Sequence, residues 1–156
     1  MTKILMIVLA GIVMAGSAVP TVAQEIKRSI TKVAGDVYRF QNRFHFALVT
    51  VTNAGVVVVD PINESAAQWL RDNLKQVTDK PITHLIYSHS HGDNASGGKA
   101  LVGRGTQVIA HANAPADIDG VKPTMRFSDQ KSLKVGGKTF ELTYPDRAIA
   151  WAMPHL

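Results

Sequence analysis

Three side chains that could bind a metal ion lie close together within residues 84–98. This segment reads His-Leu-Ile-Tyr-Ser-His-Ser-His-Gly-Asp-Asn-Ala-Ser-Gly-Gly and centres on His89-x-His91-x-Asp93. Imidazole nitrogen and carboxylate oxygen are the ligands that suit zinc and similar divalent ions. Such an ion lowers the pKa of water and polarises the bond to be cleaved. The segment therefore predicts a metal site for hydrolysis, and a merely polar surface loop is the alternative interpretation.

A buried strand is expected to position this segment. Residues 82–87 are largely apolar, and the His/Asp loop follows at their carboxyl end, where α/β architectures place their chemistry. Upstream, alternation and a valine run predict a meander of strands, followed by a helix that Asn63 caps. Downstream, a helix, a strand and a hairpin around Gly136-Gly137 are expected. The predicted strands are 36–40, 44–52, 56–60, 82–87, 107–111, 132–135 and 138–144, and the predicted helices are 64–77 and 95–101.

Composition indicates one globular domain without a nucleic-acid partner. The chain has 156 residues, 46% of them hydrophobic and 19% charged, with a net charge of +5. It lacks the basic stripe with interleaved aromatic residues that is typical of nucleic-acid binding. It also contains no cysteine, so a metal site must be built from His, Asp, Glu and Asn. Composition leaves the oligomeric state open.

The N-terminus has the pattern of a secretory signal peptide. Lys3 precedes the apolar stretch 4–15, and small residues then lead to Ala23 before polar Gln24. We predict a signal peptide over residues 1–23, with cleavage after Ala18 as the alternative. The mature protein is then periplasmic or secreted and has no stable membrane anchor after cleavage. An uncleaved anchor is the other possibility that the pattern leaves open.

The His-x-His-x-Asp loop, its preceding strand and the Gly97-Gly98 pair together resemble the first motif of the metallo-β-lactamase superfamily. Val-Val-Asp60-Pro61 and the stretch from Thr124 to Pro145 are also similar to that family. The resemblance implies an α/β fold: the N-terminal part of a four-layer αβ/βα sandwich, as a partial domain over residues 24–145. It further implies a zinc-dependent hydrolase with a small-molecule substrate, such as an ester, a thioester or a lactam.

The resemblance also implies roles for individual residues. His89 and His91 would hold the first Zn²⁺ and Asp93 the second, while Asp60 is either a carboxylate that orients ligands or a strand-end cap. The family usually has histidine directly after the aspartate, whereas this chain has Asn94. Because amide oxygen is a poorer zinc ligand than imidazole, we expect one ion, with Asp93 acting on the water as the catalytic residue, and regard a second site as doubtful.

The end of the sequence departs from the family pattern. After Tyr-Pro the family reads Gly-Pro-Gly-His, and this chain reads Asp146-Arg147-Ala148. If one G is restored to the gene directly after the Pro145 codon, the reading frame shifts and the codons that follow can encode Gly-Pro-Gly-His. We therefore expect residues 146–156 to be an out-of-frame tail and the C-terminal half to be missing.

The downstream histidines do not supply an expected third ligand. His111 resembles a family position that is not a ligand, and His155 lies in the tail. The expected chain is a truncated hydrolase of reduced or no activity. A catalytically silent metal-binding or accessory protein and a pseudogene product are the alternatives.

Overall fold

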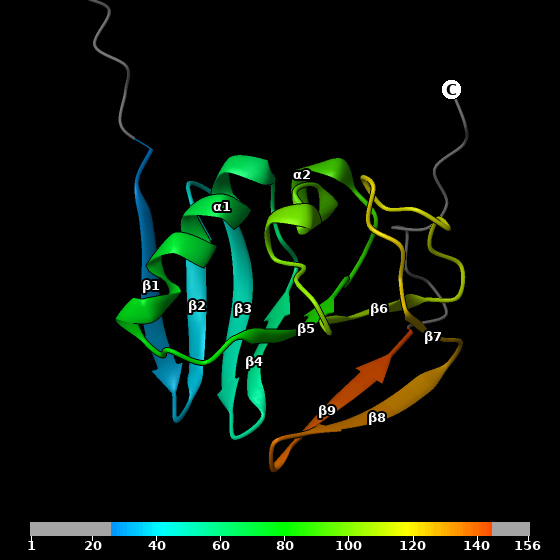
Figure 1. Ribbon diagram of the computed structural model, residues 1–156. Coiled ribbons are helices and arrows are strands. Elements are labelled where there is room, and N and C mark those ends of the chain that lie inside the picture. The colour runs from blue at the N-terminus through cyan, green and yellow to red at the C-terminus, as the bar shows by residue number, and fades with distance from the viewer. Residues whose placement is uncertain (1–25, 145–156) are drawn as a thin grey trace, which may run out of the picture.

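One seven-stranded mixed sheet forms the body of the molecule (Figure 1). The computed structural model describes residues 26–144, so the predicted signal peptide 1–23 and the predicted tail 146–156, with His155, lie outside the described residues. Strands β1 to β7 follow one another across the sheet in chain order, and β8 and β9 form a separate hairpin. The strands are β1 (Arg28–Ala34), β2 (Val37–Asn42), β3 (His45–Thr52), β4 (Gly55–Val59), β5 (Ile82–Ile86), β6 (Gln107–His111), β7 (Met125–Phe127), β8 (Gln130–Val135) and β9 (Lys138–Thr143).

The sheet changes from antiparallel to parallel pairing at β4. Strands β2 to β4 form the predicted antiparallel meander, and β1, which was not predicted, pairs antiparallel with β2. Strands β4 to β7 pair in parallel. Parallel neighbours need a crossover between them. Helix α1 (Glu64–Asn73) and the short 3₁₀ helix η1 (Leu74–Gln76) supply the first crossover, from β4 to β5. The carboxyl ends of β4 and β5 therefore lie side by side at one end of the sheet.

Helix α1 forms where the sequence predicted it. The Asn63 side chain caps the helix by accepting a hydrogen bond from the Ala66 N–H at 3.0 Å. Its apolar face buries Leu70 against the sheet, and Trp69 stacks on Phe40 of β2 with ring centroids 5.6 Å apart. The spacing of the apolar residues thus fixes which face of the helix meets the sheet.

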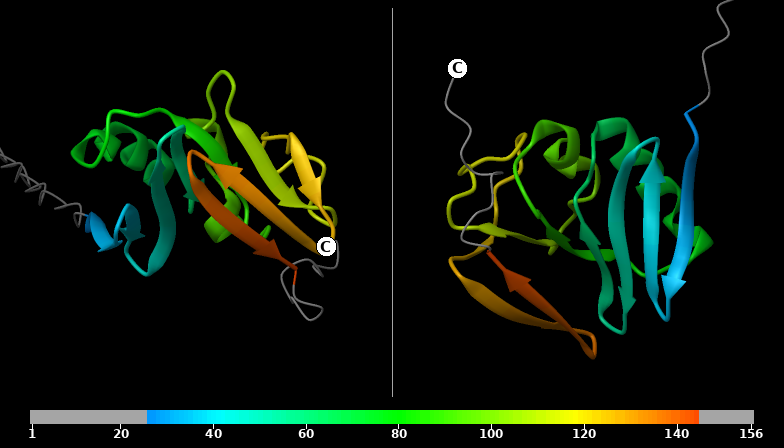
Figure 2. Two further views of the ribbon diagram at one scale, coloured as in Figure 1. Left: turned by 90° about the horizontal axis from the view of Figure 1, so that it is seen from below. Right: turned by 180° about the vertical axis from the view of Figure 1, so that it is seen from behind.

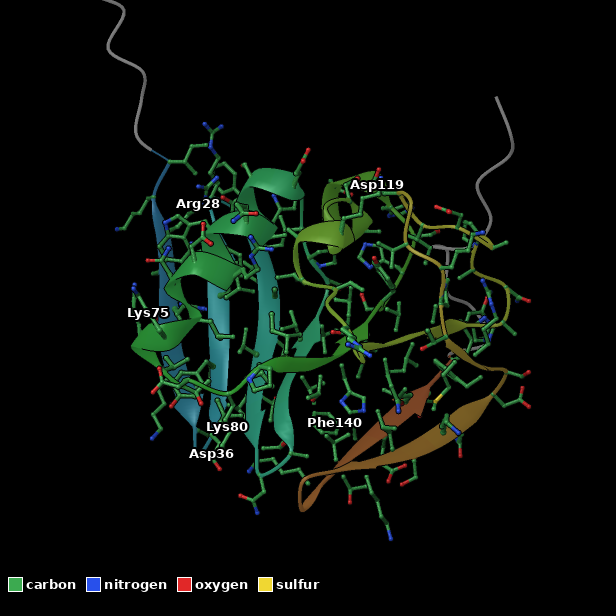
Figure 3. All side chains as sticks on the ribbon, viewed as in Figure 1. Arg28, Asp36, Lys75, Lys80, Asp119 and Phe140 are labelled. Carbon is green, nitrogen blue, oxygen red and sulfur yellow. The ribbon has the colours of Figure 1, made fainter. Side chains whose placement is uncertain are left out.

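The two faces of the sheet are covered by different elements. Figure 2 shows α1 on one face and the β8–β9 hairpin on the other. Val56 and Val58 of β4 pack on the helical side, whereas Val57 packs on the hairpin side with Phe140 of β9 (Figure 3). This two-sided burial explains why β4 reads as an unbroken valine run and not as an alternating pattern. The predicted α/β class is confirmed.

The helix predicted over 95–101 is wrong. Helix α2 (Gly92–Ala95) starts within the loop and ends at Ala95, and a separate 3₁₀ helix η2 (Gly98–Ala100) follows. The chain breaks between them because Ser96 is extended and Gly97 adopts a left-handed φ of 81°. Strand β7 was not predicted, since its three residues are too short for a pattern. Within residues 26–144, no helix is long and apolar enough to cross a membrane.

Tyr87 directly follows β5 and lies next to the His/Asp loop, and its buried hydroxyl leads to a testable prediction about stability. Its side chain is buried, and its Oη is the one buried side-chain polar atom in residues 26–144 that lacks a hydrogen-bond partner. An unpaired buried hydroxyl is costly, so Tyr87→Phe is expected to raise the free energy of unfolding by about 1 kcal/mol. Urea unfolding measures this change, with Tyr38→Phe on half-buried β2 as the control. A loss of stability in Tyr87→Phe would contradict the expectation.

Candidate metal centre

The structure brings the three sequence-predicted site residues together at the carboxyl end of β5. His89, His91 and Asp93 each offer a ligand atom, and these atoms all lie within 4.8 Å of one another. Among residues 26–144 they are the one group of three or more such side chains gathered this closely. We call them the HHD cluster. Two nitrogens and one carboxylate oxygen at this spacing fit a divalent ion such as zinc.

Asp60 fixes the orientation of His89 through Ser88. Asp60 follows β4, and its carboxylate accepts hydrogen bonds from the Ser88 N–H at 2.8 Å and from the Ser88 hydroxyl. The Ser88 Oγ also lies 2.7 Å from His89 Nδ1. Since the hydroxyl proton goes to Asp60, Oγ accepts from the Nδ1–H of His89, and the lone pair of this ring resides on Nε2. This arrangement presents Nε2 as the ligand atom and favours the orienting role for Asp60 over a mere strand cap.

The backbone beside this carboxylate is strained. Asp60 and Ile62 adopt φ values of 62° and 73°, a left-handed region that non-glycine residues rarely occupy. The Asp60 N–H donates to the Ile86 carbonyl, and the Ile62 N–H donates to the Asn94 carbonyl at 2.8 Å. These bonds tie the ends of β4 and β5 together around the cluster. Strained residues of this kind concentrate at functional sites.

The stability of the metal-free protein should depend on the ionisation of Asp60. Burial raises the pKa of the Asp60 carboxyl, against the opposing effect of the hydrogen bonds from Ser88. Because the folded state then holds the proton more tightly than the unfolded chain, stability is lost as pH rises through the raised pKa. Asp60→Asn removes this ionisation. In urea titrations, we expect the free energy of unfolding of Asp60→Asn to increase relative to that of wild type as pH rises above the ordinary pKa of a carboxyl group. A difference independent of pH would contradict this.

Asn94 lies against the cluster where the family has histidine. Its side-chain amide donates to the Nε2 of His89 at 2.9 Å. The contact agrees with a lone pair on that nitrogen. It also places a neutral amide, a weak zinc ligand, next to the nitrogen that faces the cluster. The expectation of one ion with a doubtful second site stays a prediction.

His45 is a site residue that the sequence reasoning missed. It is the first residue of β3, and its Nε2 lies 3.3 Å from Asp93 Oδ2. The predicted meander could have revealed this position. Strand β3 runs antiparallel to β4 and pairs Leu48 with Val59, so the first residues of β3 lie next to the carboxyl end of β4. Asp60 follows β4 at the same end of the sheet. The antiparallel pairing therefore places a histidine at the start of β3 near the loop.

His111 lies outside the HHD cluster. This buried side chain at the end of β6 donates from Nε2 to the Ser128 carbonyl, and its Nδ1 accepts from the Asn113 N–H at 3.1 Å. Its ring stacks on Tyr144 with centroids 3.7 Å apart. Both ring nitrogens thus bond the backbone, which fits the expected structural role.

A cavity of about 380 Å³ reaches the metal loop at Ser88. It lies between the sheet and the β8–β9 hairpin, with a mainly apolar wall. Its lining includes Val59, Ile86, Ser88, Phe127, Phe140 and Leu142.

Sequence comparison places these features in a known family. A family model described as the metallo-beta-lactamase superfamily matches residues 42–150. The alpha subunit of 2,4-dinitroanisole O-demethylase from Nocardioides sp. is 28% identical over 144 residues, covering 86% of this chain and 44% of the relative. The metallo-beta-lactamase type 2 of Elizabethkingia meningoseptica is 28% identical over 121 residues, covering 67% and 46%. The chain spans less than half the length of these two curated relatives.

Solved structures show the same fold. The metallo-beta-lactamase from Pontibacter korlensis superposes with a TM-score of 0.59 at 20% identity, covering 74% of this chain and 59% of that one. A mutant of the flavo di-iron protein from Thermotoga maritima gives a TM-score of 0.65 at 20% identity, covering 76% and 36%. The described residues therefore correspond to part of a longer metallo-beta-lactamase fold. Because the family model spans more than half of the sequence, this chain belongs to the metallo-beta-lactamase superfamily.

Proposed function

We propose that this chain carries the metal centre of a zinc-dependent hydrolase that acts on a small-molecule substrate. The observation that carries the proposal is the HHD cluster at the carboxyl end of β5. Family membership supports it, since the metallo-beta-lactamase type 2 of Elizabethkingia meningoseptica is among the relatives. Asp60 supports it further, because a ligating histidine is commonly oriented by a carboxylate in this way.

Each residue of the cluster has a proposed task. His89 and His91 would hold the ion through imidazole nitrogen, and Asp93 through a carboxylate oxygen. A bound divalent ion supplies Lewis-acid activation of water and of the scissile bond. Asp93 would also act on the water by accepting its proton at a carboxylate oxygen, for which its 62% exposed side chain is accessible. Ser88 passes the orienting effect of Asp60 to His89.

Zinc is the proposed metal because the donor set is two imidazoles and one carboxylate, a combination that suits it. Iron is the competing ion, since imidazole and carboxylate ligands also bind iron and a flavo di-iron protein shares the fold. The metal that gives stoichiometric binding and turnover decides between them.

The proposed substrate is a small ester, thioester or lactam with an apolar portion. The cavity beside Ser88 is about 380 Å³, a size suited to a small molecule, and has a mainly apolar wall. We further propose that the protein acts in the periplasm or outside the cell after loss of residues 1–23, as their charged and apolar pattern indicates.

The proposal is tested with the purified full chain. Metal content is measured after reconstitution with zinc, iron, cobalt or manganese, and hydrolysis is followed with chromogenic ester, thioester and lactam reporters. We expect one tightly bound equivalent of zinc and turnover of at least one reporter. Removing the metal with a chelator should abolish turnover, and adding zinc should restore it. Turnover that survives metal removal would contradict the proposal.

A non-catalytic metal-binding protein is the second candidate, and Asn94 is the observation that favours it. The Asn94 amide hydrogen-bonds the His89 Nε2 and replaces an imidazole of the family motif. A folded protein that binds one zinc ion and turns over no reporter supports this candidate. The variant Asn94→His then separates the two: gained turnover would show that the amide alone silences a competent centre.

A further inference from the structure

A groove of about 470 Å³ lies at the amino ends of β5 and β6, whereas the HHD cluster lies at the carboxyl end of β5. We call it the basic groove. One of its walls is the segment 78–82, which leads from η1 into β5, and the other is the segment 100–106, which leads from η2 into β6. A volume of this size suits a small molecule.

The base of the basic groove is apolar. Buried Leu74 and Leu101 belong to its lining, and both are members of the hydrophobic core on the helical side of the sheet. Half-buried Ile82 and Val102 also line it and pack against the same core. The groove therefore offers apolar side chains that are already held in place by the core.

Hydrogen bonds between the walls fix the shape of the basic groove. The hydroxyl of buried Thr106 donates to the Ile82 carbonyl at 3.1 Å and accepts from the Gly103 N–H at 3.0 Å. Arg71 of α1 donates to the Ala100 carbonyl at 3.3 Å. Because the protein makes these bonds itself, a ligand does not have to order the groove on binding.

The rim of the basic groove is positively charged. Asp79 is the one carboxylate in its lining, against four cations: Arg71, Lys75, Lys80 and Arg104. Within residues 26–144, neither Lys75 nor Arg104 forms an ion pair, and both are exposed. Like charges around one groove repel each other, and an anion between them is attracted by each. The rim therefore selects for negative charge.

We propose that the basic groove binds a small amphiphilic acid, whose apolar ring or chain lies on Leu74 and Leu101 and whose carboxylate is held by Lys75 and Arg104. Charge complementarity at the rim and the apolar base together define this ligand class. The groove shares no residue with the metal centre, so this inference is independent of the proposed function. Because the charges of the rim are exposed, each should contribute only a modest factor to affinity.

Binding of 2-naphthoate to the full chain tests the inference, followed by ¹H–¹⁵N NMR titration. We expect a dissociation constant of about 0.1–1 mM, with the shifted amides concentrated in segments 78–82 and 100–106. Two comparison probes separate the two parts of the ligand: neutral 2-naphthamide keeps the rings, and acetate keeps the carboxylate. Each should bind at least about ten-fold more weakly than 2-naphthoate.

Charge-removing variants test the assignment to the rim. Lys75→Gln and Arg104→Gln should each weaken 2-naphthoate binding about two- to five-fold, and the double variant about ten-fold. The matched control is Lys134→Gln, which removes an exposed cation of β8 outside the groove and should bind like wild type. Circular dichroism checks the fold of each variant.

The remaining outcomes overturn the inference in distinguishable ways. No binding of 2-naphthoate, equal binding of 2-naphthamide, or an unchanged affinity in the double variant each overturns it. His91→Ala should bind 2-naphthoate like wild type. Binding that is lost in His91→Ala but kept in the double variant places the anion at the metal centre, and leaves the proposed function intact. Sedimentation with phosphatidylglycerol vesicles that depends on Lys75 and Arg104, without 2-naphthoate binding, assigns the rim to a membrane surface instead.

Discussion

Replacing His91 with alanine is expected to weaken zinc binding at least about 100-fold, which corresponds to about 2.7 kcal/mol. The substitution removes one of the three ligand atoms gathered within 4.8 Å, and the remaining His89 and Asp93 cannot complete a zinc site by themselves. His91 is only half-buried and lies outside the hydrophobic core. The variant should therefore fold normally, so the loss reports on the ion and not on the structure.

Competition with a chromophoric zinc chelator measures this affinity. The matched control is His84→Ala, which removes an imidazole from β5 but not from the cluster. His84 has a pKa lowered by burial, and its Nδ1 lies 3.0 Å from Thr83 Oγ1, so it is a structural histidine. The control should bind zinc like wild type. Equal affinities for His91→Ala and wild type would mean that the ion, if bound, lies elsewhere.

The sequence predicted most of the framework because the pattern of this fold is local. The valine run of β4, the Asn63 cap and the apolar strand before the loop each carry their own signal. The HHD cluster could likewise be predicted from the sequence, because its three residues lie within five consecutive positions of one loop and the short helix that follows it. Each of these features depends on residues that are neighbours in the chain.

The features that sequence reasoning missed depend on contacts between distant segments. His45 is 48 residues from Asp93, and only the pairing of β3 with β4 brings the two together. Strand β7 exists because β6 offers a free parallel edge to three residues with little pattern of their own. The break after α2 has the same origin, because Gly97 meets the start of α1 across the site. The pairing register of the strands and the path of the crossover connections determine such contacts, and a local sequence pattern does not specify either of them.

Gly97→Ala is expected to destabilise the protein by at least about 3 kcal/mol. The residue has a φ of 81°, and its Cα faces the backbone that opens α1. An added Cβ would lie 2.4 Å from the Glu64 nitrogen and 2.5 Å from the Asn63 carbonyl carbon, so backbone would have to move. The left-handed conformation costs alanine about 1–2 kcal/mol, and loss of the Asn63 cap adds about 1 kcal/mol. The overlap itself adds to both.

Gly105→Ala isolates the conformational part of this cost. Gly105 has a similar φ of 86°, but a Cβ there would meet nothing within 4 Å. Urea unfolding should therefore show a loss of about 1–2 kcal/mol for Gly105→Ala and a clearly larger loss, or no folded protein, for Gly97→Ala. Equal losses of stability in the two variants would mean that the start of α1 can move away from the added Cβ without a measurable loss of stability.

The Gly97 contact also bears on the metal centre. Its N–H donates to the Asp119 carboxylate at 2.8 Å, and Asp119 lies beside α2 (Figure 3). Gly97 is thus held between Asp119 and α1, two residues after the end of the short helix α2 that contains Asp93. If α1 does not yield, Gly97 must shift away from it, and that shift would move α2 relative to β5. A folded Gly97→Ala protein should therefore bind zinc more weakly than Gly105→Ala, although neither glycine contributes a ligand.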